Sequence, residues 1–164
     1  MYSLNPSNGK IKQLQAKEDV ISDYSIANQA FEMVYFGLSA SNSQRLYTYN
    51  LKNDASSCLI DLSKEILRDV TLGEVQDWNF VSAQGDTIYG RFYLPPHFDA
   101  TKKYPMIVNY YGGTTPTARV MESRYPSHVY AGLGYIVYII QPSGATGFGQ
   151  EFSARHVNAW GKLT

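Results

Sequence analysis

Cysteine is almost missing from this sequence of 164 residues, which contains only Cys58. A disulfide framework needs at least two cysteines, and one thiol cannot build a metal site by itself. A nucleophilic cysteine would need a histidine and a setting that lowers its pKa, and the local sequence offers neither. We therefore predict that Cys58 is a small apolar residue buried in a strand.

An excess of charge of either sign is also missing. The chain has 14 Lys and Arg residues against 14 Asp and Glu residues, so its formal net charge is zero. This balance provides no electrostatic footprint for nucleic acid or for an anionic membrane. The 14 tyrosines are not interleaved with basic residues, as a platform for single-stranded nucleic acid would require. We expect no nucleic-acid partner.

Long hydrophobic runs are absent too. The longest apolar stretch, residues 135–140, has the length of a strand, whereas a membrane helix needs roughly 18 apolar residues. The first residues lack the basic segment and the apolar segment of a signal peptide. We expect no membrane segment, and the sequence carries no targeting signal that would indicate a compartment.

Motifs for metals and nucleotides are weak. His97, His128 and His156 lie far apart and show no H-x-x-x-H or H-E-x-x-H spacing, so metal binding is not expected. The glycines of residues 144–149 reverse the G-x-G-x-x-G order of dinucleotide sites and do not follow a first strand. We interpret them as a loop that shapes an active-site wall, and we expect no cofactor.

Residues 1–72 alternate short strand patterns with polar turns. Asn8-Gly9 is a strong hairpin signal, and Leu46 and Thr48 fall on one strand face while Tyr47 and Tyr49 fall on the other. The pattern predicts an antiparallel meander, with further strands in residues 21–26, 33–38 and 58–61. It fits one propeller blade and part of another, or a free-standing small sheet. Residues 62–70 form a short helical connector, which Ser63 could cap.

Residues 73–164 have a different pattern. Residues 75–82 and 87–94 are strand-like and flank the compact turn at residues 83–86, so they should pair antiparallel. Residues 105–111 and 135–140 are nearly continuous apolar runs, typical of strands that are covered on both faces. A helix is expected in the later part of residues 121–133, and another begins near residue 149. The order strand, helix, strand, helix predicts a parallel α/β layout with an antiparallel edge.

This order is how an α/β-hydrolase sheet begins, yet the nucleophile of such an enzyme is absent from the sequence. Hydrolases of this fold carry the serine in G-x-S-x-G at a sharp strand-to-helix turn. Ser39 alone has a glycine two places before it, but Ser41 stands where the second glycine should be. We therefore expect no Ser, Asp and His triad in this chain.

An oxyanion-binding element is better represented. Tyr111-Gly112-Gly113 follows a predicted core strand, at the place where α/β-hydrolases often carry an H-G-G-type loop that supplies one donor. A tyrosine hydroxyl could serve as that donor if it points into a cleft, and the two glycines would let the backbone turn. The alternative is a core tyrosine that simply precedes a turn.

The ordered set of motifs resembles the start of the catalytic domain of the prolyl oligopeptidase family, closest to its dipeptidyl peptidase IV and acylaminoacyl-peptidase branches. The similarity covers residues 76–164 well, and residues 1–72 are less specifically similar to the end of that family's propeller. It is carried by residues 86–99, 102–113, 134–137 and 142–149 and by Phe152, Trp160 and Gly161.

The resemblance implies the mixed fold class already outlined: a partial propeller blade over residues 1–72, then the incomplete start of an α/β-hydrolase domain over residues 73–164. It implies a parent serine peptidase that cleaves short peptides, with Tyr111 as an oxyanion-hole donor and Gly112 and Gly113 as the loop backbone. The triad of that parent would lie beyond Thr164. The parent's compartment, cytoplasm or periplasm, stays open.

The sequence also departs from the family pattern. The loop that usually reads Asp-Pro-Arg-Gly is Gln141-Pro142-Ser143-Gly144 here, so a family salt bridge at that turn is in doubt. Thr114 stands where a proline usually follows the two glycines, and the acidic pair that holds a substrate's amino terminus in dipeptidyl peptidases is not found. Substrate specificity is therefore open.

Two hypotheses follow for the chain itself. The first is a fragment of a serine peptidase that is inactive alone because the triad is absent. The second is a stand-alone β-rich binding or interaction module. Truncation of a parallel sheet would leave an open, apolar edge, which predicts self-association of the chain.

Overall fold

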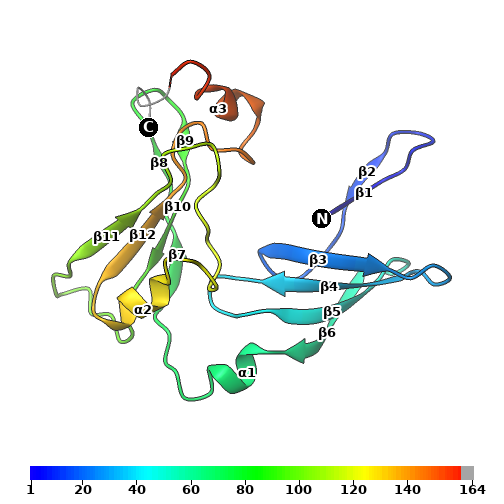
Figure 1. Ribbon diagram of the computed structural model, residues 1–164, viewed down its shortest axis with the longest axis horizontal. Helices are drawn as coiled ribbons and strands as arrows, with labels where there is room; N and C mark the ends of the chain where they lie inside the picture. Colours follow the sequence, from blue (N-terminus) through cyan, green and yellow to red (C-terminus); the bar gives the residue numbers. More distant parts are fainter. Residues whose placement is uncertain (160–164) are drawn as a thin grey trace. The chain divides into compact units, whose positions relative to one another are not determined.

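The computed structural model describes residues 1–159, and these form two compact units. One unit comprises Met1–Val70 with Val120–Glu122, and the other comprises Thr71–Arg119 with the chain from Ser123 onward. Most of the regular structure is β-sheet (Figure 1). Trp160 and Gly161, which contributed to the family resemblance, lie outside the described residues.

The N-terminal unit begins with a hairpin of β1 (Tyr2–Leu4) and β2 (Ile11–Gln13), which pair antiparallel. Gly9 in its turn has φ of +70°, a left-handed backbone that glycine adopts without strain, so the Asn8-Gly9 prediction is confirmed. An antiparallel meander follows, as predicted, in the order β3-β4-β5-β6. Its strands are β3 (Val20–Ile26), β4 (Glu32–Leu38), β5 (Arg45–Asn50) and β6 (Ala55–Asp61).

One face of the meander carries the core of this unit. Tyr47 and Tyr49 of β5 are buried, and they pack with Met33 and Tyr35 of β4. The rings of Tyr35 and Tyr47 stack with centroids 5.1 Å apart. The alternation predicted for β5 is thus confirmed, because successive side chains of a strand point to opposite faces.

Two local predictions in this unit are wrong. Cys58 is exposed on β6, which is an edge strand of the meander. The short helix α1 (Ser63–Ile66) has Leu62 at its N-cap without a side-chain cap. Asp61, rather than Ser63, supplies the nearby acceptor, because its carboxylate accepts a 2.9 Å hydrogen bond from the Ser63 N–H.

The C-terminal unit contains a mixed sheet in the order β11-β12-β10-β7. Its strands are β7 (Val75–Asp77), β10 (Gly90–Tyr93), β11 (Met106–Asn109) and β12 (Ile136–Ile140). β11 and β12 run parallel, while β10 pairs antiparallel with both β12 and β7, so the predicted mixed sheet is confirmed. A small hairpin of β8 (Phe80–Val81) and β9 (Thr87–Ile88) extends the antiparallel pair.

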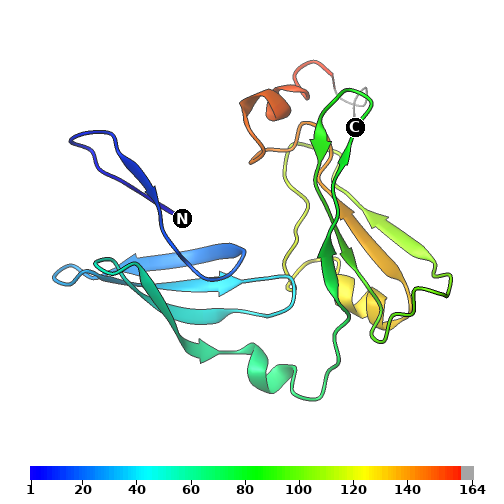
Figure 2. The same ribbon diagram turned by 180° about the vertical axis from the view of Figure 1, so that it is seen from behind.

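Helices α2 (Ser127–Gly132) and α3 (Gln150–Ala154) occupy the positions that the pattern predicted. α2 packs against β12 and β10, and Phe152 of α3 packs with Ile88 and Ala145. Figure 2 shows the chain leaving β12 toward α3 at one end of the sheet, with α2 near the other end.

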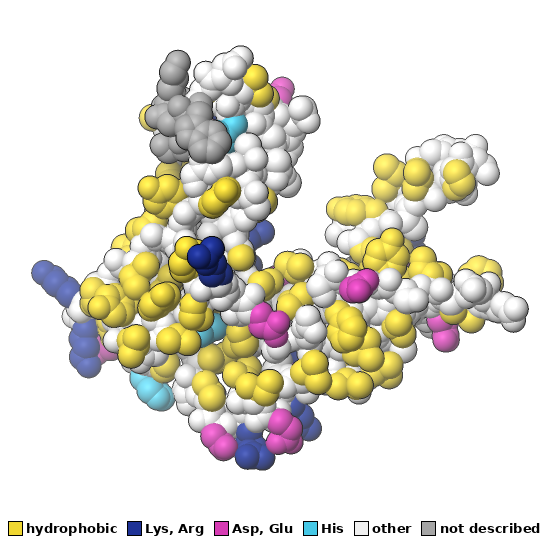
Figure 3. Space-filling model, viewed as in Figure 1, with side chains coloured by type: hydrophobic (Ala, Val, Ile, Leu, Met, Phe, Trp, Pro, Cys, Tyr) yellow, Lys and Arg dark blue, Asp and Glu magenta, His cyan; other side chains and the backbone are white. Residues whose placement is uncertain are grey.

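β12 is buried as expected, but β11 is not covered on both faces. Val137, Tyr138 and Ile139 are at most 5% exposed, whereas Met106 and Val108 of β11 are 53% and 48% exposed. β12 has a neighbouring strand on each side, while β11 is the edge strand of the described sheet. Figure 3 shows hydrophobic side chains at the surface over β11 and α2. An apolar sequence pattern therefore overstated the burial of this strand.

Candidate functional site

The candidate site lies where the chain leaves β11. Because β11 and β12 are parallel, the loops that follow their carboxyl ends meet at the same edge of the sheet. Tyr110 and Tyr111 come directly after β11, and both side chains are largely exposed, at 60% and 55%. In open α/β sheets, ligands bind at the carboxyl ends of the strands, so this edge is where a site is expected.

A surface cavity of about 320 Å³ opens beside Tyr111. Tyr110 and Tyr125 contribute aromatic walls, and Arg124 is the charged residue among those that line it. The Arg124 guanidinium lies over the Tyr125 ring, 5.7 Å from its centroid. Tyr111 therefore lines a cavity and is not a core tyrosine, while its role as an oxyanion donor stays a prediction.

The glycines after Tyr111 differ in their surroundings. A Cβ atom at Gly113 would lie 2.6 Å from Cε1 of the Tyr111 ring, so this ring folds back over the Gly113 backbone. A Cβ at Gly112 would meet nothing within 4 Å. Gly113 thus leaves room for the tyrosine ring, and Gly112 has no comparable steric demand.

The loop after β12 contacts the loop after β11. The N–H and Oγ1 of Thr146 both donate to the Thr114 carbonyl oxygen, at 2.8 and 3.1 Å. Gly144, Gly147 and Gly149 all have φ near +90° to +100°, at 93°, 92° and 102°. The glycine loop therefore has a conformational reason for its glycines, and it lies against the segment that follows Tyr111.

The Gln141-Pro142-Ser143-Gly144 turn lacks the charged residues that are usual in the family, and one of its hydroxyls contacts Asp86. Ser143 Oγ donates to the Asp86 carboxylate at 3.2 Å, and Arg155 forms an ion pair with it at 3.1 Å. The Asp86 side chain is only 12% exposed. Asp86 thus contacts the turn through the Ser143 hydroxyl and contacts the end of α3 through the Arg155 guanidinium.

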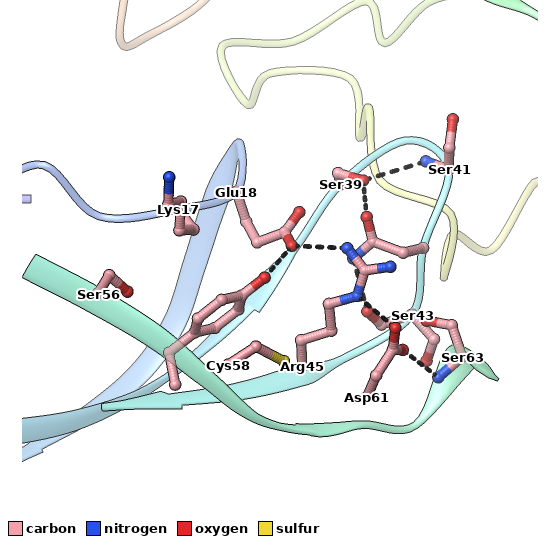
Figure 4. Close-up of polar contacts among 12 residues, drawn as sticks. Lys17, Glu18, Ser39, Ser41, Ser43, Arg45, Ser56, Cys58, Asp61 and Ser63 are labelled. Carbon is pink, nitrogen blue, oxygen red and sulfur yellow. Dashed lines mark hydrogen bonds and ion pairs between the residues drawn. The ribbon is translucent and has the colours of Figure 1, made fainter. Parts of the chain in front are cut away.

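A second polar cluster lies in the N-terminal unit, and the sequence analysis missed it. Its centre is Glu18, whose side chain is 8% exposed and forms a 3.1 Å ion pair with Arg45. Tyr47 donates a hydrogen bond to the same carboxylate oxygen, and Asp61 accepts a 2.9 Å ion pair from Arg45 (Figure 4). These residues come from the segment before β3 and from β5 and β6, so no local spacing reveals them.

The electrostatics of this cluster favour a structural role over acid–base chemistry. Burial is the main cause that raises the pKa of Tyr47, and its hydrogen bond to Glu18 raises it further, so the phenol stays protonated and donating. Burial alone would lower the pKa of Arg45, but the contact with Glu18 and the charge of Asp61 outweigh burial and raise it. The cluster fastens the segment before β3 to the meander.

The three histidines do not come together as a site. His128 meets the Tyr93 ring edge-on at 5.0 Å, while His156 lies against Gly144. Within residues 1–159, no group of three potential metal-ligating side chains is assembled. None of the described helices has the length and apolar character that crossing a membrane requires.

Comparison with known proteins finds relatives that are named as peptidases. It is 29% identical over 154 residues to dipeptidyl-peptidase 5 of Porphyromonas gingivalis, a match that covers 93% of this chain and 22% of that protein. It is 37% identical over 86 residues to a probable dipeptidyl-peptidase 5 of Aspergillus terreus, covering 52% of this chain and 11% of that protein. The chain thus spans a minor part of the length of these relatives. No protein-family model matches the sequence.

Solved structures share the fold across both units. An acylaminoacyl peptidase of Pyrococcus horikoshii matches with a TM-score of 0.74 at 20% identity, covering 90% of this chain and 23% of that one. An acylaminoacyl peptidase in complex with Z-Gly-Gly-Phe-chloromethyl ketone matches with a TM-score of 0.75 at 20% identity, with the same coverage of 90% and 23%. The sequence relatives and the shared fold confirm the resemblance to the prolyl oligopeptidase family, and the chain matches one segment of these longer proteins.

Proposed function

We propose that this chain is part of a serine peptidase that cleaves short peptides, and that Tyr111 is an oxyanion donor of that enzyme. The observation that carries the proposal is the position of Tyr111 just past the carboxyl end of β11, with its ring exposed at the rim of a cavity. The names of the relatives, and the peptide-derived ligand in one structural neighbour, support a peptide as the substrate.

The proposed chemistry uses the phenol as a hydrogen-bond donor. When a serine hydroxyl attacks the scissile carbonyl, negative charge develops on the carbonyl oxygen, and a donor fixed in place stabilises it. In the part of the chain that the structure describes, the Tyr111 hydroxyl forms no hydrogen bond, so its proton is available to a ligand. The serine and its His and Asp partners would come from the rest of a longer protein.

The two units fit the proposed domain division. The antiparallel meander β3–β6 supports a terminal propeller blade segment over residues 1–72. The order β7-β10-β12-β11, with one parallel pair, supports the start of an α/β-hydrolase sheet over residues 73–164. The alternative of a stand-alone binding module would be favoured if the natural reading frame did not continue into a G-x-S-x-G segment.

The chain alone should be inactive, because it contains no G-x-S-x-G serine. We expect neither hydrolysis of chromogenic dipeptide and tripeptide substrates nor labelling by a fluorophosphonate probe. Labelling of any serine in this chain would contradict the proposal.

We also propose that the chain self-associates through the exposed edge strands β6 and β11. Sedimentation as a clean monomer at moderate concentration would rule this out.

The role of Tyr111 is tested in a complete peptidase that carries this segment. Tyr111→Phe removes only the hydroxyl and should lower kcat by about 10²–10³, with a much smaller effect on KM. Tyr110→Phe is the matched control, since Tyr110 lines the same cavity and is similarly exposed. An unchanged kcat in Tyr111→Phe, or an equal loss in both variants, would remove the donor role.

A further inference from the structure

A buried glutamine contacts the loop that carries Tyr111. Gln141 follows β12 directly and is 0% exposed. Its side-chain oxygen accepts a hydrogen bond from the Thr117 N–H, and its side-chain nitrogen donates to the Thr117 carbonyl oxygen, each at 2.8 Å. One amide side chain thus pairs with both backbone groups of Thr117, much as a neighbouring strand would.

The hydroxyl of Thr117 continues the connection. Thr117 Oγ1 donates to the Ile140 carbonyl oxygen at 3.0 Å and accepts a hydrogen bond from the Tyr111 N–H at 3.1 Å. Thr117 is itself buried, at 9% exposure. Because the hydroxyl acts as donor and acceptor at once, its orientation is fixed, and it links the end of β12 to the backbone of Tyr111.

This connection matters because β11 ends at Asn109, so Tyr111 lies beyond the strand's own ladder. A donor that stabilises developing charge must be held in place before the reaction begins, and loops hold side chains less firmly than strands do. The Gln141 backbone is also anchored, since its N–H donates to the Tyr89 carbonyl oxygen at 2.8 Å. The chain of contacts therefore runs from the sheet to the proposed donor.

We infer that Gln141 and Thr117 are positioning residues for Tyr111: Gln141 fixes Thr117, and the Thr117 hydroxyl fixes the Tyr111 backbone. The catalytic meaning of this inference rests on the proposed oxyanion role, whereas the contacts themselves do not. The glutamine that departs from the family's usual turn sequence therefore has a specific task here. A neutral amide suits it, because it must accept from one backbone group and donate to the other.

The first test measures hydrogen exchange of single amides in the 164-residue chain. Thr117→Val keeps the side-chain shape but loses the hydroxyl, so the Tyr111 amide should exchange about 10- to 100-fold faster. Thr117→Ser keeps the hydroxyl and should restore slow exchange. Thr115→Val is the control, because Thr115 is exposed beside the same cavity and takes no part in these contacts. Amides of β10 and β12 report whether the unit remains folded.

Gln141→Glu gives an independent arm, in case the valine variant does not fold. A carboxylate accepts from the Thr117 N–H but cannot donate to its carbonyl oxygen, so the Thr117 and Tyr111 amides should again exchange faster at neutral pH. If both variants leave the Tyr111 amide as protected as in the unmodified chain, the positioning inference is wrong.

The second test separates positioning from structure in a complete peptidase that carries this segment. Thr117→Val should lower kcat about tenfold or more while changing KM little, and Thr117→Ser should recover most of the loss. If exchange responds but neither Thr117→Val nor Tyr111→Phe changes kcat, the contacts stand and the proposed oxyanion role falls. If Tyr111→Phe lowers kcat and Thr117→Val does not, the role stands and positioning by Thr117 is refuted.

Discussion

Gly90 gives the sharpest prediction about the sheet that carries the candidate site. A Cβ at this position would overlap Cε2 and the hydroxyl oxygen of Tyr138, closer than side-chain atoms approach one another. Tyr138 cannot move aside easily. It is 5% exposed, its ring stacks on Phe92 at 4.3 Å, and its hydroxyl donates to the Trp78 carbonyl oxygen at 3.1 Å.

The magnitude for Gly90→Ala follows from these contacts. Overpacking a core site costs about 1–3 kcal/mol, and disturbing the hydrogen bond and the ring stack adds roughly 0.5–1.5 kcal/mol each. Replacing glycine with alanine restricts the unfolded chain and returns about 0.4–1 kcal/mol. We expect a net loss of about 1–5.5 kcal/mol, centred near 3 kcal/mol, in the free energy of unfolding of the C-terminal unit.

Urea unfolding followed by the fluorescence of Trp78 measures this loss, because the Trp78 ring packs against both Phe92 and Tyr138. Trp160→Phe in all samples leaves Trp78 as the sole tryptophan, since the sequence has two. For a loss near 3 kcal/mol and a typical m-value of about 1–3 kcal/mol/M, the midpoint should fall by roughly 1–3 M. Gly132→Ala is the control, since a Cβ there meets nothing within 4 Å and should be neutral or slightly stabilising.

A double-mutant cycle tests whether Tyr138 is the cause. In a Tyr138→Leu background, Gly90→Ala should cost at least 1 kcal/mol less, because directly contacting residues show coupling energies of about 0.5–3 kcal/mol. An unchanged midpoint for Gly90→Ala, or the same cost in both backgrounds, would refute the steric reasoning.

Three further predictions concern the polar cluster and the oxyanion loop. Gly37→Ala would place a Cβ 2.7 Å from Glu18 Cγ, so it should displace Glu18 and lower the stability of the N-terminal unit by about 1–3 kcal/mol, measured by urea unfolding. Burial alone would raise the pKa of Asp61, but Arg45 outweighs it and the pKa is lowered, so Asp61 stabilises the fold above its ordinary pKa of 3.8. That contribution should disappear as the pH falls through the lowered value, and Asp61→Asn should remove the corresponding slope of stability against pH. Gly113→Ala should turn the ring of the proposed donor and lower kcat of a complete peptidase more than alanine at the preceding glycine does; equal effects would contradict this.

Local patterns were sufficient where the chemistry is local. The Asn8-Gly9 turn, the two-residue alternation of β5 and the strand-helix-strand order around α2 all depend on neighbouring residues, and all were predicted from the sequence. The position of Tyr111 after β11 follows from the same reasoning. The fold was needed to show that the Tyr111 ring lies at a cavity, which is consistent with the predicted cleft.

Contacts between distant segments required the tertiary structure. Glu18 meets Arg45 and Tyr47 from a segment nearly 30 residues earlier in the chain, at separations of 27 and 29 residues. Gln141 reaches back 24 residues to Thr117. No spacing rule predicts such pairs, because they exist only once strands and loops have been placed side by side.

The sequence by itself determined the strands, the parallel pair and the family resemblance, because hydrophobic period, turn chemistry and ordered motifs are properties of adjacent residues. The tertiary structure alone decided which strands are covered. β12 is buried between two strands, while the equally apolar β11 lies at an edge with Met106 and Val108 exposed. Cys58 is likewise exposed on the edge strand β6. It also decided that Gln141 and Thr117 hold the loop of Tyr111. Burial depends on what packs against a residue, and hydrogen-bond partners depend on what the fold brings within about 3 Å.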